Sequence, residues 1–486
     1  MRSQTAPIPD RDTYNPEKYS NCIFTEAEAR ESLRLSFTPG LTVIRNFLPI
    51  FVNEHIINRF QIMKILLAGI ACLCAAGASA TTPTIQLDQL ASNYYAYPYT
   101  SSPAPELTPS PKGYKPFHIE HYGRHGSRWH IGKSMYRTPV EILEIAERNG
   151  KLTPRGKEVL AQLRDIEVQS RGRDGELTPL GAAQHRGIAR RMYANFPEVF
   201  ADGSHVDAKS TVVIRCILSM DNELQELLAA NPALEITSDA SRSTMYYMNF
   251  TDTDTVAQNA AKLASDQLKE FQKKNRTEHK FIDKLVTDPK FAADSMNVGS
   301  LAWYLEKLSA NAQSHYGMPH FYDLFDEDEI YNQWVNDNVS WFVRMGNSRL
   351  TDNLAAFSQR RLLRNMIESA DTTLASPLTS ANLRFGHEVC VLPLVVLMEL
   401  DHYGDEINNL DEVTEKWKNY EIFPMASNVQ VIFYRPEGST DPADVLVKVL
   451  LNERETTLPV ATAAAPYYKW SDLRDYYLKK LERVPD

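Results

Sequence analysis

Residues 114–130 read YKPFHIEHYGRHGSRWH and contain the most informative motif of the chain. The apolar and aromatic residues of Phe117–Tyr122 predict a buried strand. Arg124, His125 and Arg128 follow directly at its end. In open α/β sheets, ligands bind outside the carboxyl ends of the strands. Guanidinium groups match the oxygens of a phosphate. The stretch therefore predicts a phosphate-binding loop with a histidine at its centre.

His125 suits the role of a nucleophile, because a neutral imidazole has an unperturbed pKa of about 6.5. Arg124 and Arg128 would bind the phosphoryl oxygens, and Gly126 would let the backbone pass close to them. Hydrolysis of a phosphate ester also needs a proton for the leaving alcohol. The alternative is an ordinary surface loop with two solvated arginines.

A second segment, residues 381–400, reads ANLRFGHEVCVLPLVVLMEL. It predicts a strand over Asn382–Phe385 and then a buried helix, with His387 and Glu388 at the junction. A histidine at this position can bind phosphate, and a carboxylate beside it can protonate the leaving oxygen. A lone His-Glu pair is usually a surface turn, but the preceding strand and the separate Arg-His-Gly motif favour a site.

A third segment, residues 210–220, reads STVVIRCILSM. It places Arg215 between a predicted strand, Thr211–Ile214, and a helix, so we expect Arg215 to bind phosphate as well. The alternative is a surface arginine at a helix start. Arg242 is a weaker candidate, since a solvated loop residue explains it equally well.

Short runs of Val, Ile and Leu alternate with helical patterns, which is typical of an α/β fold. We predict a three-layer α/β core with a mixed, mainly parallel sheet, formed by residues 113–249 and 376–486. Strand signals fade over 250–375, which predicts a mainly helical cap domain inserted into the core. Further strands are predicted at Leu234–Thr237, Val429–Tyr434 and Val445–Leu450, and helices at Thr255–Gln272, Asn353–Ala370 and from near Ser471.

Three Thr-Pro pairs predict helix starts. Threonine caps the free amides of a helix, and proline at the first position has no amide to leave unpaired. The pairs are Thr138-Pro139, Thr153-Pro154 and Thr178-Pro179.

The composition is that of an ordinary globular protein, with 486 residues, 43% hydrophobic and 23% charged. The net charge of −10 argues against a nucleic-acid partner, because affinity for a phosphate backbone comes from clustered Lys and Arg. A few converging arginines would still form a positive pocket for a small anion.

Residues 63–80 are typical of a signal peptide, with a short positive start, an apolar run and the small-residue end Ala78-Ser79-Ala80. Since such a signal belongs at the N-terminus, we expect residues 1–62 to be a non-native upstream extension. Cleavage would leave an extended lead-in at 81–112 and a periplasmic or secreted protein with no membrane anchor. The alternative is a buried core helix.

Cys216 and Cys390 would remain after cleavage. One disulfide between them is compatible with an oxidising compartment. Each, however, follows a proposed site segment at a helix start, which favours buried free thiols.

Together these segments resemble the histidine phosphatase superfamily, in its acid-phosphatase and phytase branch. Within that branch the multiple inositol polyphosphate phosphatases of secreted bacterial type are most similar. The resemblance covers most of residues 113–460. It rests on Arg124-His125-Gly126-Ser127-Arg128, the helix start Glu176–Gly181, the corner at Arg215 and Gly386-His387-Glu388.

The resemblance implies hydrolysis of inositol polyphosphates such as phytate, or of similar small phosphate esters, without a metal or other cofactor. His125 would be the nucleophile that becomes phosphorylated, and Glu388 the proton donor. Phosphate would be held by Arg124, Arg128, Arg215 and His387. The oligomeric state is left open.

Glu388 also marks a departure from the family pattern. Many members of the branch have aspartate directly after the late histidine, and the inositol polyphosphate subfamily typically has histidine-alanine-glutamate. Here glutamate follows His387 directly, and it reaches one methylene further than aspartate. A second departure is Trp129-His130, where the branch often has proline.

Other functions are compatible with parts of the sequence. A metallohydrolase could use His118, Glu120, His121, His125 and His130, although residues 118 and 120 share one face of a strand while 121 points away. A phosphomutase, a broad-specificity acid phosphatase and a catalytically degenerate inositol-phosphate-binding protein are further alternatives.

Overall fold

The computed structural model describes residues 85–100, 103–249, 255–276 and 280–484. The predicted upstream extension at 1–62 and the predicted signal peptide at 63–80 lie outside these residues. Within the described ranges, every helix is too short or too polar to cross a bilayer.

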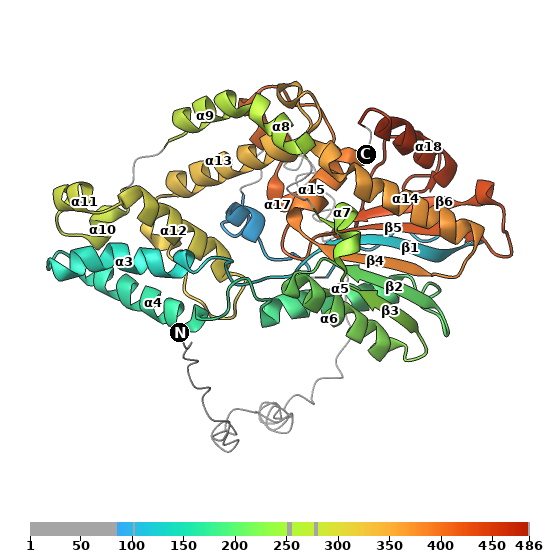
Figure 1. Cartoon of the computed structure of the whole chain (residues 1–486), viewed down its shortest axis with the longest axis horizontal. Coiled ribbons are helices and arrows are strands. Elements are labelled where there is room, and N and C mark those ends of the chain that lie inside the picture. Colours follow the sequence, from blue (N-terminus) through green and yellow to red (C-terminus); the bar gives the residue numbers. More distant parts are fainter. Residues whose placement is uncertain (1–84, 101–102, 250–254, 277–279, 485–486) are drawn as a thin grey trace, which may run out of the picture. The chain divides into compact units, whose positions relative to one another are not determined.

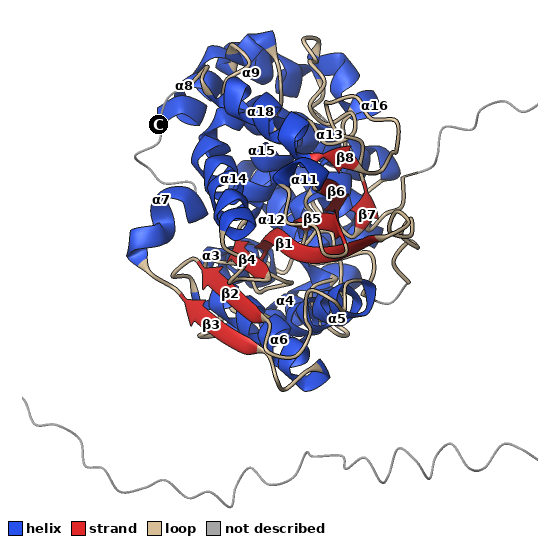
Figure 2. Cartoon of the chain, turned by 90° about the vertical axis from the view of Figure 1, so that its right-hand side faces the viewer, coloured by secondary structure: helices blue, strands red, loops and turns tan. Residues whose placement is uncertain are grey.

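A mixed sheet runs through the fold, with helices on both faces (Figure 1, Figure 2). β3, β2, β4 and β1 are parallel neighbours, whereas β5 pairs antiparallel with β1 and β6 antiparallel with β5. The predicted α/β class with a mixed, mainly parallel sheet is therefore confirmed. Across the sheet the order is β3 (Glu235–Asp239), β2 (His205–Ser210), β4 (Ala381–Gly386), β1 (Tyr114–Arg124), β5 (Asn428–Pro436), β6 (Leu446–Leu451) and β7 (Arg454–Glu455), and β8 (Tyr468–Lys469) also pairs with β6.

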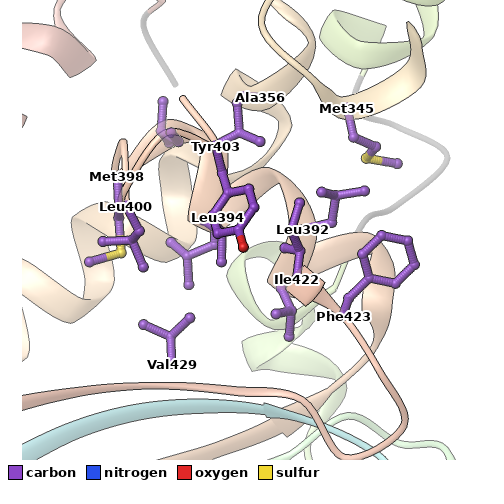
Figure 3. Close-up of a cluster of buried hydrophobic side chains, with 14 of the residues drawn as sticks. Met345, Ala356, Leu392, Leu394, Met398, Leu400, Tyr403, Ile422, Phe423 and Val429 are labelled. Atoms are coloured by element: carbon purple, nitrogen blue, oxygen red, sulfur yellow. The ribbon is translucent and has the colours of Figure 1, made fainter. Parts of the chain in front are cut away.

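Each face of the sheet packs against helices and forms an apolar core with them. Along β5, Val431 and Phe433 alternate with Ile432 and Tyr434, so successive side chains enter opposite cores. One core contains α5 and α6, and the other contains α14, α15 and α18. Figure 3 shows part of the second core around Leu394. These helices span Pro179–Asn195 (α5), Ile214–Ala230 (α6), Arg360–Ala375 (α14), Glu388–Leu397 (α15) and Trp470–Leu481 (α18).

Between β3 and β4, the described elements are all helices. The apolar side chains of α10, α11 and α12 pack with those of α3 and α4, which precede β2 in the chain. Residues 134–170 thus form a layer of helices together with α10–α12, here called the helical layer. The cap boundaries at 250–375 stay a prediction. The helices are α3 (Ser134–Arg148), α4 (Pro154–Ser170), α7 (Met245–Met248), α8 (Thr255–Leu263), α9 (Ser265–Lys274), α10 (Ile282–Leu285), α11 (Pro289–Ser295), α12 (Val298–Ala312) and α13 (Glu327–Met345).

Short helices complete the structure at the ends of longer elements and in connections. Two are α-helical, α16 (Val413–Lys416) and α17 (Asn419–Ile422). The 3-10 helices are η2 (Gln89–Tyr94), η3 (Arg242–Thr244), η4 (Tyr322–Leu324), η5 (Arg349–Thr351), η6 (Ala355–Gln359), η7 (Leu410–Glu412) and η8 (Pro442–Asp444). The lead-in predicted to be extended is therefore helical at η2.

Two of the three predicted threonine caps are confirmed. Thr153 accepts a hydrogen bond from the Gly156 amide, and Thr178 accepts one from the Gly181 amide. The start at Thr138 is wrong, because α3 begins one turn earlier and contains Pro139. Burial of the apolar face of α3 offsets the hydrogen bond that this proline cannot make.

The predicted strand Thr211–Ile214 is also wrong. The strand is β2, which ends at Ser210, and α6 begins at Ile214. β2 has half-exposed polar residues at every second position, so its apolar signal is weaker than that of the turn after it. The helix predicted over 255–272 is divided into α8 and α9 near Ala264, and the one predicted from 353 begins at Arg360. The remaining strands agree within a few residues.

Candidate active site

The carboxyl ends of β1 and β4 hold the predicted nucleophile. Arg124 and Gly386 are the last register pair of these parallel strands. The His125 amide donates to the Gly386 carbonyl (2.9 Å), and the Ala426 amide donates to the His125 carbonyl (3.0 Å). β2 leads to Arg215 at the same edge, so the sheet brings the three predicted segments together.

A close backbone contact fixes the loop against α5. A Cβ on Gly126 would lie 2.5 Å from the Gly181 carbonyl oxygen, and a Cβ on Gly181 would lie 2.2 Å from the Ser127 carbonyl oxygen, so only glycine fits at either position. The Thr178 hydroxyl donates to the Ser127 carbonyl (3.0 Å). The Ser127 amide donates to Oε1 of Gln184 (2.8 Å). The capped start of α5 therefore supports the phosphate loop.

His125 is buried and has the tautomer that a nucleophile needs. Its Nδ1 lies 2.9 Å from the Gly126 carbonyl oxygen, which can only accept, so Nδ1 carries the proton. The lone pair is then on Nε2, a buried atom with no hydrogen-bond partner. Burial and the neighbouring guanidinium groups of Arg215, Arg124 and Arg128 hold the pKa of His125 well below 6.5. The imidazole is therefore neutral at physiological pH.

The three arginines retain unused donors. Arg124 donates from Nη1 to the Phe423 carbonyl (2.7 Å) and from Nε to Oε2 of Glu388 (3.1 Å), while its Nη2 is buried without a partner. Arg128 donates from Nη1 to the Trp129 carbonyl (3.0 Å), and its Nε has no partner. Nε of Arg215 also has none. Burial lowers the pKa of Arg124 only to about 10, so it stays charged. Such buried cationic donors suit an oxyanion.

His387 lies at the N-cap position of α15 and faces His125. The rings of His387 and His125 are 5.6 Å apart, and Nε2 of His387 lies 3.3 Å from the Thr211 hydroxyl. The Sγ atom of Cys216 is 3.7 Å from the same nitrogen. Burial lowers the pKa of His387 to about 4, so at neutral pH it can take part in hydrogen bonds to phosphate as a neutral group.

Glu388 begins α15 and points back to the loop. Its Oε2 lies 3.1 Å from Nε of Arg124 and 3.6 Å from Nε2 of His125. Burial alone would raise its pKa, but Arg124, Arg128 and His387 outweigh burial and lower the pKa to about 2. Glu388 is therefore a carboxylate in this arrangement.

The alternative metal site is contradicted by the structure. Nε2 of His118 pairs with Glu120 (2.9 Å), which also forms an ion pair with Arg384. His121 packs against Phe385, and His130 lies against the Lys307 carbonyl. In the part of the chain that is described, only one group of three His, Cys, Asp or Glu side chains has its potential ligand atoms within 4.8 Å of one another, and it consists of His125, His387 and Glu388. The surrounding arginines disfavour a cation there.

Some contacts of the site lie beyond the sequence prediction. The Ser219 hydroxyl accepts a hydrogen bond from the Gly126 amide (3.1 Å), and Asn311 donates to the Arg128 carbonyl (3.0 Å). Ser219 lies one turn after Arg215 on α6, a spacing that could have identified it. Arg242 is exposed on η3, and no described residue forms an ion pair with it, so its role stays a prediction. Cys216 and Cys390 are buried free thiols, as favoured above.

Comparison with known proteins agrees with this geometry. Residues 123–452, more than half of the chain, match the histidine phosphatase superfamily (branch 2). Multiple inositol polyphosphate phosphatase 1 of Gallus gallus is 22% identical over 404 residues, which cover 78% of this chain and 85% of that protein.

Two solved structures share the fold. The Bifidobacterium longum multiple inositol polyphosphate phosphatase has a TM-score of 0.61 at 19% identity and covers 80% of this chain and 97% of its own. The phytase from D. castellii has a TM-score of 0.60 at 14% identity, over 83% of this chain and 90% of its own. With the family match, the chain belongs to branch 2 of the histidine phosphatase superfamily and is a histidine-type phosphatase acting on phosphate esters.

Proposed function

We propose that the protein hydrolyses inositol polyphosphates such as phytate, or similar phosphate monoesters, through a phosphohistidine on His125. The main support is Nε2 of His125, which is buried without a partner beside three arginines that each retain a buried nitrogen without a partner. A bound phosphoryl group would give these nitrogens acceptors.

The reaction would proceed in two displacements. In the first, the Nε2 lone pair of His125 attacks phosphorus, the bond to the ester oxygen breaks, and Glu388 gives that oxygen a proton. In the second, water attacks the phosphohistidine, the bond from nitrogen to phosphorus breaks, and Glu388 takes the proton of the water. Both residues return to their starting states.

Glu388 must gain a proton before the first displacement. The negative charge of a bound phosphate would offset Arg124 and Arg128, the groups that hold the pKa of this carboxyl at about 2. A monoanionic ester could bring the proton with it. Arg124, Arg128, Arg215 and His387 would bind the phosphoryl oxygens throughout.

The substrate class is supported by the similar proteins. The B. longum phosphatase has also been solved in complex with phosphate and with inositol hexasulfate. We further propose that residues 63–80 direct the chain to the periplasm or outside the cell. N-terminal sequencing of the natively produced protein tests this, and a start near Thr81 is expected.

Phosphate release from phytate, with separation of the intermediates over time, tests the function. We expect an ordered series of lower inositol phosphates, absent in His125→Ala. Faster turnover of simple esters than of phytate would favour a broad-specificity acid phosphatase. Phytate binding without turnover of phytate or p-nitrophenyl phosphate would identify a non-catalytic binding protein.

A further inference from the structure

Residues 85–97, here called the strap, connect the helical layer with the sheet (Figure 1, η2 in blue). The side chain of Gln313, the C-cap residue of α12, accepts a hydrogen bond from the Ala96 amide (2.8 Å) and donates one to the Asp88 carbonyl (3.1 Å). The Met425 amide, close to the end of the sheet, donates to the Tyr95 carbonyl (2.7 Å). The strap is therefore held from both sides.

An unusual backbone conformation directs the strap. Ser92 has φ 58° and ψ −125°, values that are rare outside glycine and persist only where the surroundings impose them. Ser92 is buried, and its hydroxyl accepts a hydrogen bond from the Asn419 side chain (2.6 Å). Ser92 thus forms a kink inside η2, and the last residue of η2, Tyr94, lies next to Arg128 and His130.

The ring of Tyr94 lies against Arg128. The guanidinium carbon is 5.5 Å from the ring centroid, and the same ring meets the edge of His130 at 5.0 Å. Arg128 is 3% exposed, and no carboxylate among the described residues forms a close ion pair with it, although Glu388, whose pKa it lowers, acts on it at longer range. Burying a cation without a close partner is costly, and an aromatic face offsets part of that cost.

We infer that Tyr94 is a positioning residue for Arg128. Its ring holds the guanidinium plane so that Nε remains free for a phosphoryl oxygen, and the strap is thereby part of the phosphate site. Because Tyr94 acts through an arginine assigned to phosphate, its role depends on the proposed function.

Two substitutions separate the ring from the hydroxyl. Tyr94→Leu should lower kcat/KM on p-nitrophenyl phosphate about tenfold, because a desolvated cation–π contact is lost. The Kd of inorganic phosphate should rise to a similar degree. Tyr94→Phe should restore most of this loss. Tyr95→Leu is the matched control, since its ring packs on Tyr420 instead (6.1 Å).

A double-mutant cycle identifies the partner. In an Arg128→Ala background, Tyr94→Leu should have little further effect on kcat/KM or on the Kd of inorganic phosphate. An equal loss with and without Arg128, or a Phe variant as impaired as the Leu variant, would overturn the assignment. Wild-type protein that binds inorganic phosphate but turns over no ester would refute the proposed function instead, and the Kd comparison would still decide the role of Tyr94.

Discussion

Glu388→Gln should reveal two separate effects of one carboxylate. The Oε2 atom of Glu388 contacts Arg124 and His125, so we expect a phosphoryl group attacked by His125 to bring one of its oxygens to the same place. Carboxylate and phosphate therefore compete for the same cations. The pKa of Glu388 falls from 4.5 to about 2, a net shift after burial that corresponds to roughly 3 kcal/mol in favour of the charged carboxylate. Loss of the whole ~3 kcal/mol would tighten the binding of inorganic phosphate by roughly several hundredfold. Because the amide of glutamine keeps a dipole at this position, we expect the variant to bind inorganic phosphate only about tenfold more tightly than the wild type.

The same substitution removes the acid. An alkoxide leaves poorly without a proton, so turnover of phytate or glycerol phosphate should fall by about 10²–10⁴-fold. A nitrophenolate needs less protonation, so the loss on p-nitrophenyl phosphate should be milder. Phosphoenzyme should also accumulate if the carboxylate activates the water of the second step.

Inhibition constants for inorganic phosphate and kcat on both ester types decide the matter in one preparation. Glu388→Asp is the control, because it keeps the charge and shortens the reach by one methylene. Equal losses on the two ester types, with unchanged affinity for phosphate, would show that another group is the donor and that Glu388 does not occupy the phosphate position.

Further substitutions and a pH series test the remaining assignments. His125→Ala should abolish turnover and the acid-labile phosphoenzyme without unfolding the protein, and near-normal rates would exclude it as nucleophile. Arg215→Ala should cost about 2.7–4 kcal/mol of transition-state stabilisation. A loss in kcat/KM below about tenfold would show that Arg215 does not bind the phosphoryl group. Gly181→Ala should destabilise the fold by about 1–3 kcal/mol in denaturant unfolding, because its Cβ would lie 2.2 Å from a backbone oxygen. Gly187→Ala on the same helix should cost much less, because its Cβ would come no closer than 3.1 Å to a side-chain atom, Nη1 of Arg191. Acidification from pH 6.5 to about 4 should lower Tm, because the unfolded chain protonates His121, His130 and His387, which the folded protein keeps neutral with pKa values of about 3 to 4. Their contribution to the free energy of unfolding is complete above pH 6.5 and is lost as the pH falls. A Tm that does not change over this pH range in calorimetry would contradict it.

The meeting of His125 with the three arginines could be predicted because these residues follow strand ends in the sequence. Parallel strands bring their carboxyl ends to one edge, so His125, Arg215 and His387 meet although they are distant in the chain. Tyr94 could not be predicted in the same way. Its contact with Arg128 depends on the path of the strap between two layers, and neighbouring tyrosines in the sequence give no local signal to distinguish it.

The residues at which the strands begin and end could likewise be predicted only in part. β2 has polar residues at alternate positions, and a more apolar turn beside it gave the stronger strand signal. Thr178 could be identified as a cap, because capping is local. That the same threonine also holds the Ser127 carbonyl is a tertiary contact with no counterpart in the pattern.

The packing of α3 and α4 against α10–α12 has a consequence for folding and for engineering. Leu143 and Leu160 share one core with Leu285 and Leu301, across the boundary between the first part of the chain and the proposed cap. Excising residues 250–375 would leave the apolar faces of two long helices in water and would remove the Asn311 contact to the phosphate loop. The cap would therefore not be an exchangeable module, and we expect core and cap to unfold in a single cooperative transition.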